Sequence, residues 1–262
     1  MQIGSVKEIK KHEYRVGLTP SCVRAYVTAG HTVRVQKMSG IDAGYEDDEY
    51  ESSGAILCDT AEEIWQASDM IVKVKEPQAS EYPLMKENQI LYTYLHLAAD
   101  EELTRAMLER KVKGVAYETV ETESHSLPLL RPMSEIAGRM SIQEGARFLE
   151  RPQGGRGVLL GGIPSVEKGK VAILGGGVVG THAAKMAVGT GADVTILDVN
   201  IDRLNYLDDV FAGRVHLLYS NQAHLEHVLE TSDLIVGAVL IPGAKAPHLI
   251  KKDDLRKMKK GS

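Results

Sequence analysis

Three glycines in the second half of the sequence have the spacing of a phosphate-binding loop. Gly175, Gly177 and Gly180 form a G-x-G-x-x-G motif directly after an apolar run that starts at Val171. In this motif the first glycine permits a tight turn, the second lets the backbone approach a pyrophosphate, and the third lets a helix pack on the strand. A helix predicted at 181–188 would direct its N–H groups at the phosphates. The pattern indicates dinucleotide binding; the alternative is a glycine-rich turn that binds no nucleotide.

An acidic residue at the end of the next predicted strand completes this motif. Asp198 closes the run that begins at Val194, about 20 residues after the glycines, where the motif needs an acid. Its carboxylate would accept hydrogen bonds from ribose hydroxyls and repel a 2′-phosphate. The sequence therefore favours NAD over NADP, and Arg203 weakens that preference slightly because a cation could attract the same phosphate.

Three further residues of chemical interest follow predicted strands in the first half. Arg15 lies in a loop before a helix that starts with Pro20, and Lys75 and His96 end two later strands. In parallel α/β sheets, ligands bind outside the carboxyl ends of the strands, so the three side chains are expected to converge there. A guanidinium suits a carboxylate ligand, and an imidazole exchanges protons near neutral pH.

Each of these residues also has a simpler interpretation. A single Arg or Lys on a loop is more often solvated than functional, and most histidines are not catalytic. Lys73 alternates with Lys75 along the same predicted strand, so it competes for the same role. Glu118, near another strand end, could orient a cation, although packing or solvation is the more ordinary interpretation.

Alternating strands and helices must position these residues. In the first half we predict strands at 2–6, 31–36, 70–74, 90–94 and 114–117, and helices at 20–29, 60–67 and 100–110. Such alternation indicates a parallel sheet wrapped by helices. Four more strands are predicted in the second half, at 171–174, 194–197, 215–219 and 234–239. The expected fold class is α/β, with two doubly wound parallel-sheet domains, the second a Rossmann-type dinucleotide-binding domain.

The predicted boundary between the domains follows a Leu-Pro pair at 127–128. Residues 1–128 are expected to form the substrate-binding domain, and residues 129–262 the NAD-binding domain, including an amphipathic helix at 134–149 that bridges the halves. A short helix is predicted at 252–260. Because only four strands precede it, the second domain is expected to be truncated, with a naturally short sheet as the alternative.

Composition and charge exclude several classes of function. The 31 Lys+Arg and 36 Asp+Glu residues give a net charge of −5, so no basic field is expected for nucleic acid or membrane surfaces. Cys22 and Cys58 lie far apart, so neither a metal site nor a disulfide framework is expected. The N-terminus lacks the apolar region of a signal peptide, and the apolar run at 234–241 is too short to span a bilayer. A cytoplasmic location is the default expectation.

Taken together, these segments resemble the alanine dehydrogenase family, which is related to the NAD(H)-binding domain of proton-translocating transhydrogenase. The resemblance covers the whole chain and is carried by the segment from Lys7 to Pro20, the segment from Pro132 to Met140, and the glycine motif. It implies NAD-dependent, reversible oxidative deamination of L-alanine to pyruvate and ammonia. The alternatives are a transhydrogenase-type domain without an amino-acid substrate, and a truncated NAD-binding form with little or no turnover.

The resemblance also implies roles for individual residues. Arg15 and Lys75 would bind the substrate carboxylate, with Lys75 also near the reacting carbon, and His96 would be the acid/base. Besides the motif glycines, the residues that fall where the family contacts NAD are Ser134, Val178, Val179, Asp198, Arg203, Ser220, Val239 and Leu240. A homo-oligomer is implied, a hexamer in the family. Family members continue beyond the length of this chain with a second catalytic residue, an aspartate, and a loop that closes over the nicotinamide, so turnover by this chain is itself in question.

Overall fold

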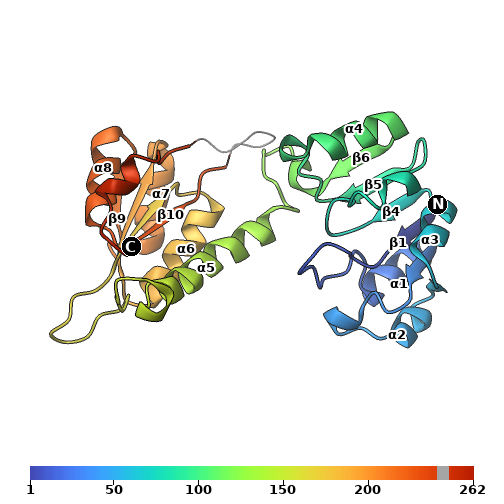
Figure 1. Cartoon of the computed structure of the whole chain (residues 1–262), viewed down its shortest axis with the longest axis horizontal. Helices are drawn as coiled ribbons and strands as arrows, with labels where there is room; N and C mark the ends of the chain where they lie inside the picture. The colour runs from blue at the N-terminus through green and yellow to red at the C-terminus, as the bar shows by residue number, and fades with distance from the viewer. Residues whose placement is uncertain (241–247) are drawn as a thin grey trace. The chain divides into compact units, whose positions relative to one another are not determined.

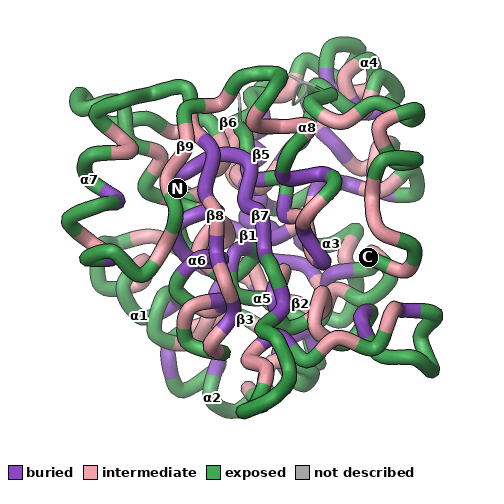
Figure 2. The backbone as a smooth tube through the Cα atoms, turned by 90° about the vertical axis from the view of Figure 1, so that its left-hand side faces the viewer, coloured by how far each residue is buried: buried purple, intermediate pink, exposed green. Residues whose placement is uncertain are grey.

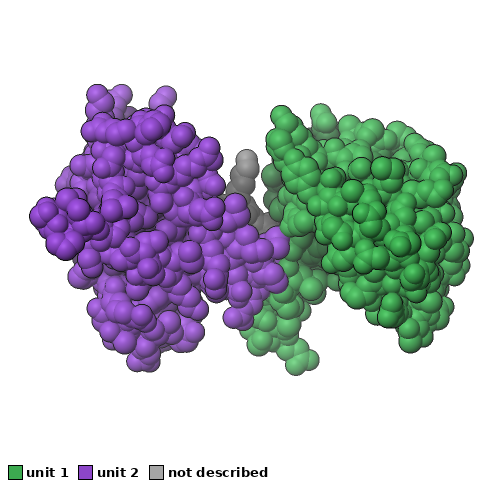
Figure 3. All heavy atoms as spheres, turned by 90° about the horizontal axis from the view of Figure 1, so that it is seen from below, with its two compact units in different colours: residues 1–129 green, residues 130–262 purple. Residues whose placement is uncertain are grey.

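The chain divides into two compact units, residues 1–129 and residues 130–262 (Figure 3). The computed structural model describes residues 1–240 and 248–262 (Figure 1). Each unit is an α/β fold with its own parallel sheet, which confirms the expected fold class. The expected boundary, between residues 128 and 129, lies beside the observed division.

A six-stranded parallel sheet forms the centre of the first unit, in the order β3-β2-β1-β4-β5-β6. Its strands are β1 (Gln2–Ser5), β2 (Thr32–Gln36), β3 (Ile56–Cys58), β4 (Met70–Val72), β5 (Ile90–Thr93) and β6 (Lys113–Ala116). The strand order reverses between β1 and β4. In doubly wound sheets, ligands bind at such a reversal, outside the carboxyl ends of the strands.

Helices cover both faces of this sheet: α1 (Pro20–Thr28), α2 (Asp47–Ser52), α3 (Ala61–Ala67) and α4 (Glu101–Arg110). Successive strand residues point to opposite faces, so Ile71 packs with α3 and α4 while Val72 packs with α1 and α2. The expected helix starts at Thr60 and Asp100 are N-caps, whose side chains accept hydrogen bonds from the N–H groups of Glu63 and Leu103.

The second unit has a four-stranded parallel sheet in the order β10-β7-β8-β9. Its elements are α5 (Arg131–Phe148), β7 (Lys170–Leu174), α6 (Val178–Gly189), β8 (Asp193–Asp198), α7 (Ile201–Phe211), β9 (His216–Tyr219), α8 (Gln222–Thr231) and β10 (Leu234–Gly237). One face packs against α5, α6 and α7, and the other against α8. Figure 2 shows the resulting burial along β7 and β8, as expected for strands covered on both faces.

Several predicted boundaries were wrong. The helix expected at 252–260 is only a short 3-10 turn, Asp254–Lys257, and the backbone is extended again at Met258. The helix expected at 134–149 begins earlier, at Arg131, since Pro132 occupies a first-turn position that needs no N–H donor. The helix expected at 181–188 begins at Val178, directly after the glycine loop. Both α2 and β3 were missed, and both are short.

Candidate functional site

The glycine loop after β7 has the shape of a phosphate cradle. Gly175 has a φ of 106°, and a Cβ at Gly180 would lie 1.8 Å from the carbonyl oxygen of Gly175, so neither position tolerates a side chain. A Cβ at Gly177, in contrast, would meet no atom within 4 Å. The loop is therefore tight where it meets the protein and open where a phosphate would approach, as the roles expected for the three glycines require.

The open side of this loop coincides with the start of α6. Gly177 is the N-cap, and no side chain accepts a hydrogen bond from the first turn at this end. Val178 is 37% exposed and Val179 is half-buried. The first N–H groups of a helix have no partner within the helix and attract anions. These residues therefore fit the pyrophosphate of a dinucleotide.

Two charged side chains hold the middle residue of the glycine loop. Asp198 Oδ2 accepts a hydrogen bond from the N–H of Gly176 at 2.6 Å, and Arg203 Nε donates one to the Gly176 carbonyl oxygen at 2.6 Å. Arg203 Nη2 also donates to the hydroxyl of Thr181 at 2.6 Å, and its guanidinium lies 4.6 Å from the ring centroid of Tyr206. Asp198 and Arg203 thus lie at the glycine loop, and both shape it.

The remaining expected cofactor residues lie in three places. Ser220 follows β9, and Val239 and Leu240 follow β10, so they share the carboxyl edge of the sheet with the glycine loop. Val239 is 36% exposed and Leu240 is 56% exposed, which leaves apolar surface at this edge. Ser134 lies instead in the first turn of α5, a helix that packs against α6.

In the first unit, Arg15 follows β1 and is paired with Glu13. Its Nε and Nη2 atoms lie 2.8 Å and 2.5 Å from the two carboxylate oxygens of Glu13. The hydrogen bonds from Arg15 lower the pKa of Glu13, and the charge of Lys75 lowers it further. A guanidinium has five N–H donors, so pairing with Glu13 does not by itself prevent Arg15 from binding a second anion.

The two competing lysines occupy different environments. Lys73 is 1% exposed, and its Nζ lies 3.3 Å from a carboxylate oxygen of Glu8 and 3.0 Å from one of Glu81. Burial raises the pKa of Glu8, while the charge of Lys73 opposes this rise. Lys75 is half-buried. Lys73 therefore belongs to a buried ion-pair network, although it also lines a pocket that contains Arg15, whereas Lys75 is the more exposed of the two lysines.

His96 follows β5 and is exposed, with φ 51° and ψ 34° in the left-handed region. Its imidazole stacks on the ring of Tyr94, with 6.3 Å between the centroids and 18° between the planes. The carboxylate of Glu118 accepts a hydrogen bond from the His96 N–H at 2.6 Å. Arg15, Lys75 and His96 thus follow β1, β4 and β5, which are neighbours in the sheet.

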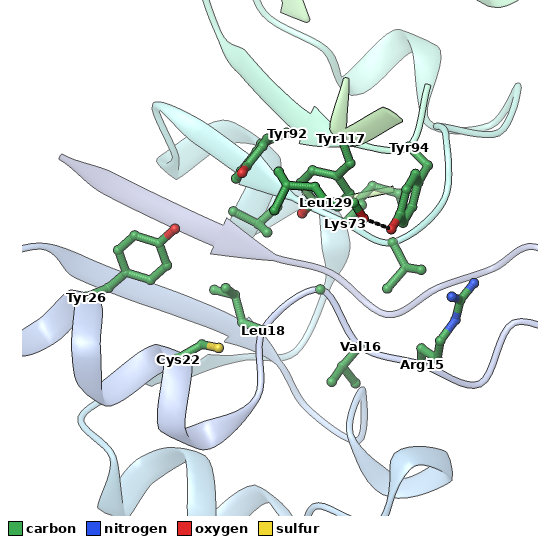
Figure 4. Close-up of a pocket in the computed structure, with 13 residues that line it drawn as sticks. Arg15, Val16, Leu18, Cys22, Tyr26, Lys73, Tyr92, Tyr94, Tyr117 and Leu129 are labelled. Atoms are coloured by element: carbon green, nitrogen blue, oxygen red, sulfur yellow. Dashed lines mark hydrogen bonds between the residues drawn. The ribbon is translucent and has the colours of Figure 1, made fainter. Parts of the chain in front are cut away.

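A pocket of about 390 Å³ lies beside Arg15 within the first unit (Figure 4). Figure 4 shows Arg15 at one end and Tyr26 at the other, with further phenol rings between them. The aromatic and apolar residues that line it are Val16, Leu18, Tyr26, Val72, Val74, Tyr92, Tyr94, Tyr117 and Leu129. Burial raises the pKa of Tyr117, so this phenol stays neutral. Lys73 also lines the pocket, whereas Lys75 and His96 do not, so the pocket gathers only one of the three expected residues together with the competing lysine.

Sequence reasoning missed several residues of this region. Glu8 accepts a hydrogen bond from the backbone N–H of Lys75, and Glu13 accepts one from the guanidinium of Arg15. The ring of Tyr94 lies beside that of His96. The two-residue spacings of Glu13 and Arg15 and of Tyr94 and His96 were the local signals among these pairs. Glu118 was considered as a partner for a cation, and the structure shows that its carboxylate accepts backbone N–H groups instead.

Residues 1–240 and 248–262, which the structure describes, contain no group of three His, Cys, Asp or Glu side chains placed to bind a metal ion. None of their helices has the length and apolar character required to cross a membrane.

Comparison with known proteins assigns the family. Residues 4–137 match the family described as alanine dehydrogenase/PNT, N-terminal domain, and residues 141–262 match its C-terminal domain. An alanine dehydrogenase of Methanococcus maripaludis is 55% identical over 262 residues, and alanine dehydrogenase 2 of Staphylococcus aureus is 56% identical. Each alignment covers 100% of this chain and 70% of the relative.

Solved structures show the same relationship. An L-alanine dehydrogenase matches with a TM-score of 0.91 and 56% identity, over 100% of this chain and 72% of that chain. The transhydrogenase from Sinorhizobium meliloti has a TM-score of 0.80 at 22% identity, over 100% of this chain and 76% of that chain, which shows a shared fold. Because both family domains match along nearly the whole sequence, the chain belongs to the alanine dehydrogenase/PNT family.

Proposed function

We propose that this chain catalyses the NAD-dependent, reversible oxidative deamination of L-alanine to pyruvate and ammonia. The observation that carries the proposal is its identity of 55% and 56%, along the full chain, with proteins named alanine dehydrogenase. The chain also has, in separate units, a glycine loop that fits a pyrophosphate and three candidate substrate-binding residues that follow neighbouring strands.

The second unit would hold the dinucleotide. Gly175, Gly177 and Gly180 shape the loop for the pyrophosphate, and the uncapped start of α6 supplies N–H donors. Asp198 would bind the ribose hydroxyls, which favours NAD. Ser134, Val178, Val179, Arg203, Ser220, Val239 and Leu240 complete the proposed contacts. When bound, NAD accepts the hydride from the substrate Cα.

The first unit would hold the substrate. We assign the carboxylate to Arg15, because a planar guanidinium fixes both its position and its orientation. The ammonium of Lys75 stabilises negative charge that develops on the substrate oxygen. His96 exchanges protons with the oxygen and nitrogen of the carbinolamine that links the imine to pyruvate and ammonia. The exposure of His96 leaves its imidazole accessible for this role.

The test is the formation of NADH, followed at 340 nm, with L-alanine, L-serine, glycine and D-alanine as substrates. We expect L-alanine to give the highest kcat/KM, and pyruvate plus ammonia to consume NADH. If NADH binds but no amino acid is oxidised, a transhydrogenase-type or purely NAD-binding role replaces this proposal. Transfer of hydride between two nucleotides would then separate those two alternatives.

We also propose that the chain forms a homo-oligomer, as the family resemblance implies. Multi-angle light scattering of the eluted chain tests this, since a mass of 28.6 kDa would identify a monomer. The cytoplasmic location expected from the sequence stays a prediction.

A further inference from the structure

His96 occupies a backbone conformation that is uncommon for a residue other than glycine. Its φ of 51° and ψ of 34° lie in the left-handed region, which a non-glycine residue adopts only at a cost in free energy. The carboxylate of Glu118 binds the backbone here through two consecutive N–H groups. Oε1 accepts from Leu95 at 3.1 Å and from His96 at 2.6 Å, and Oε2 accepts from Leu95 at 3.2 Å.

Consecutive N–H groups that point to one side form a concave site for an anion. In this chain the anion is a side chain of the protein itself. Glu118 lies in the 3-10 turn Tyr117–Thr119 directly after β6, and His96 lies directly after β5, the neighbouring strand. The contact therefore ties together the carboxyl ends of two adjacent strands, 22 residues apart in the sequence.

A second contact restrains the imidazole itself. The ring of Tyr94 stacks on it, and the Tyr94 hydroxyl donates a hydrogen bond to the carbonyl oxygen of Leu129 at 2.8 Å. Tyr94 thus lies nearly parallel to the ring, and Glu118 binds the backbone from which the ring projects. Together they limit the directions in which the imidazole can point.

The same arrangement recurs at Lys75. The carboxylate of Glu8 accepts hydrogen bonds from the N–H of Val74 at 2.6 Å and from the N–H of Lys75 at 3.3 Å. In both places one carboxylate binds two consecutive N–H groups, and the second belongs to a candidate catalytic residue. Glu8 also pairs with the buried Lys73, so its removal would disturb folding, whereas Glu118 is only half-buried. Glu118 is therefore the residue at which the effect can be tested.

We propose that Glu118 is a positioning residue for His96: its carboxylate holds the Leu95–His96 peptide in the conformation that directs the imidazole at the substrate. This inference rests on the proposed function, because it assigns a purpose to the orientation of His96. Glu118 itself exchanges no proton with the substrate. Its effect on turnover passes entirely through His96.

The first test compares Glu118→Ala and Glu118→Gln. Loss of the carboxylate should lower kcat by about 10- to 100-fold, the scale expected when a reacting group is misplaced by about 1 Å. Gln keeps an oxygen at the Oε1 position, which accepts from both N–H groups, so it should restore kcat to within about threefold of the original chain. KM for NAD should not change in either variant. Glu121→Gln is the matched control, because Glu121 lies in the same segment and pairs with His125 instead.

A double-mutant cycle separates positioning from a general structural effect. In the His96→Ala background, followed in single turnovers at high enzyme concentration, Glu118→Ala should cause no further loss of rate. An equal loss in both backgrounds, or an unchanged kcat in Glu118→Ala alone, would overturn the proposal.

An independent readout does not depend on activity. The backbone amide of His96 should exchange slowly with solvent in the original chain and in Glu118→Gln, and at least tenfold faster in Glu118→Ala, as measured by ¹⁵N NMR. Absence of alanine oxidation by the original chain would refute the proposed function alone. An unchanged exchange rate in Glu118→Ala would refute the positioning role alone.

Discussion

The carboxylate of Asp198 lies 2.6 Å from the backbone nitrogen of Gly176, in the middle of the glycine loop. The residue expected to select the ribose therefore also shapes the loop that receives the pyrophosphate. Asp198 Oδ1 accepts a further hydrogen bond from the N–H of Asn200 at 2.9 Å. Replacement of Asp198 thus has two separable effects, one on charge and one on loop geometry.

We predict that Asp198→Asn raises the ratio of kcat/KM for NADP to that for NAD by about tenfold, or ~1.4 kcal/mol. Asn keeps an oxygen for the Gly176 N–H but removes the negative charge that repels a 2′-phosphate. Steady-state kinetics with both cofactors measure the ratio. Asp202→Asn, at an exposed position in α7, should leave it unchanged. An unchanged ratio in Asp198→Asn would show that the charge at this position does not select the cofactor.

His96→Ala should lower kcat for alanine by about 100-fold or more, since general acid–base catalysis contributes on that scale. The affinity for NADH, measured by its fluorescence on binding, should stay within about twofold, because the glycine loop belongs to the other unit. His227→Ala, at an exposed position in α8 of the second unit, is the control for loss of a histidine. Normal turnover in His96→Ala would remove this residue from the mechanism.

Arg15→Lys should raise KM for pyruvate by about 10-fold or more while leaving KM for NADH unchanged. Lys keeps the charge but loses the planar fork that binds a carboxylate through two hydrogen bonds. Arg24→Lys, at an exposed position in α1, provides the matched control. If KM for pyruvate is unaffected in Arg15→Lys, the carboxylate binds elsewhere.

The sequence predicted where the candidate residues lie in the fold when their position depends on local order along the chain. The glycine loop, Asp198, and the three residues that follow β1, β4 and β5 were all located from strand ends and spacing. Parallel strands place their carboxyl ends at one edge, so these assignments needed no knowledge of distant contacts. The short helix α2 was missed because six residues carry too little periodicity to be recognised.

Contacts between distant segments could not be predicted in this way. Glu8 reaches the N–H of Val74 across 66 residues, and nothing near either residue signals the pair. Lys73 and Lys75 alternate like strand residues, but β4 ends at Val72, so period-two alternation does not decide which lysine is buried. Only the packing of Glu8 and Glu81 around Lys73 settles it.

Lys73→Met and Lys75→Met should therefore affect different properties of the protein, the first its stability and the second its turnover. Lys73→Met leaves Glu8 and Glu81 buried without their cation, which should lower the free energy of unfolding of the first unit by about 3–5 kcal/mol. Lys75→Met should keep that free energy within about 1 kcal/mol and lower kcat instead. Fluorescence of Trp65, the one tryptophan of the sequence, reports urea unfolding of this unit. Equal stability of the two variants would contradict the buried network.

The second unit should lose stability in acid partly through Asp233. Burial alone would raise the pKa of this carboxyl, but the N–H of Lys170 and the charges of Lys259 and Arg156 lower it below its usual value. A lowered folded-state pKa contributes stability that is complete above the unfolded value of 3.8 and is lost as the pH falls through the folded value. Asp233→Asn should thus lower the free energy of unfolding of the second unit by about 1–3 kcal/mol at pH 7.

The free energy of unfolding of the second unit should differ between the original chain and Asp233→Asn by a constant amount from pH 7 to pH 5. This difference should shrink below pH 3.8, where the aspartate itself becomes protonated. Hydrogen exchange of β7, which begins at the Lys170 N–H that Asp233 binds at 2.8 Å, reports the local stability. Asp209→Asn, at an exposed position in α7, should have no effect on it. A difference that instead grew toward low pH would mean that the pKa of Asp233 in the folded chain lies above, and not below, its unfolded value.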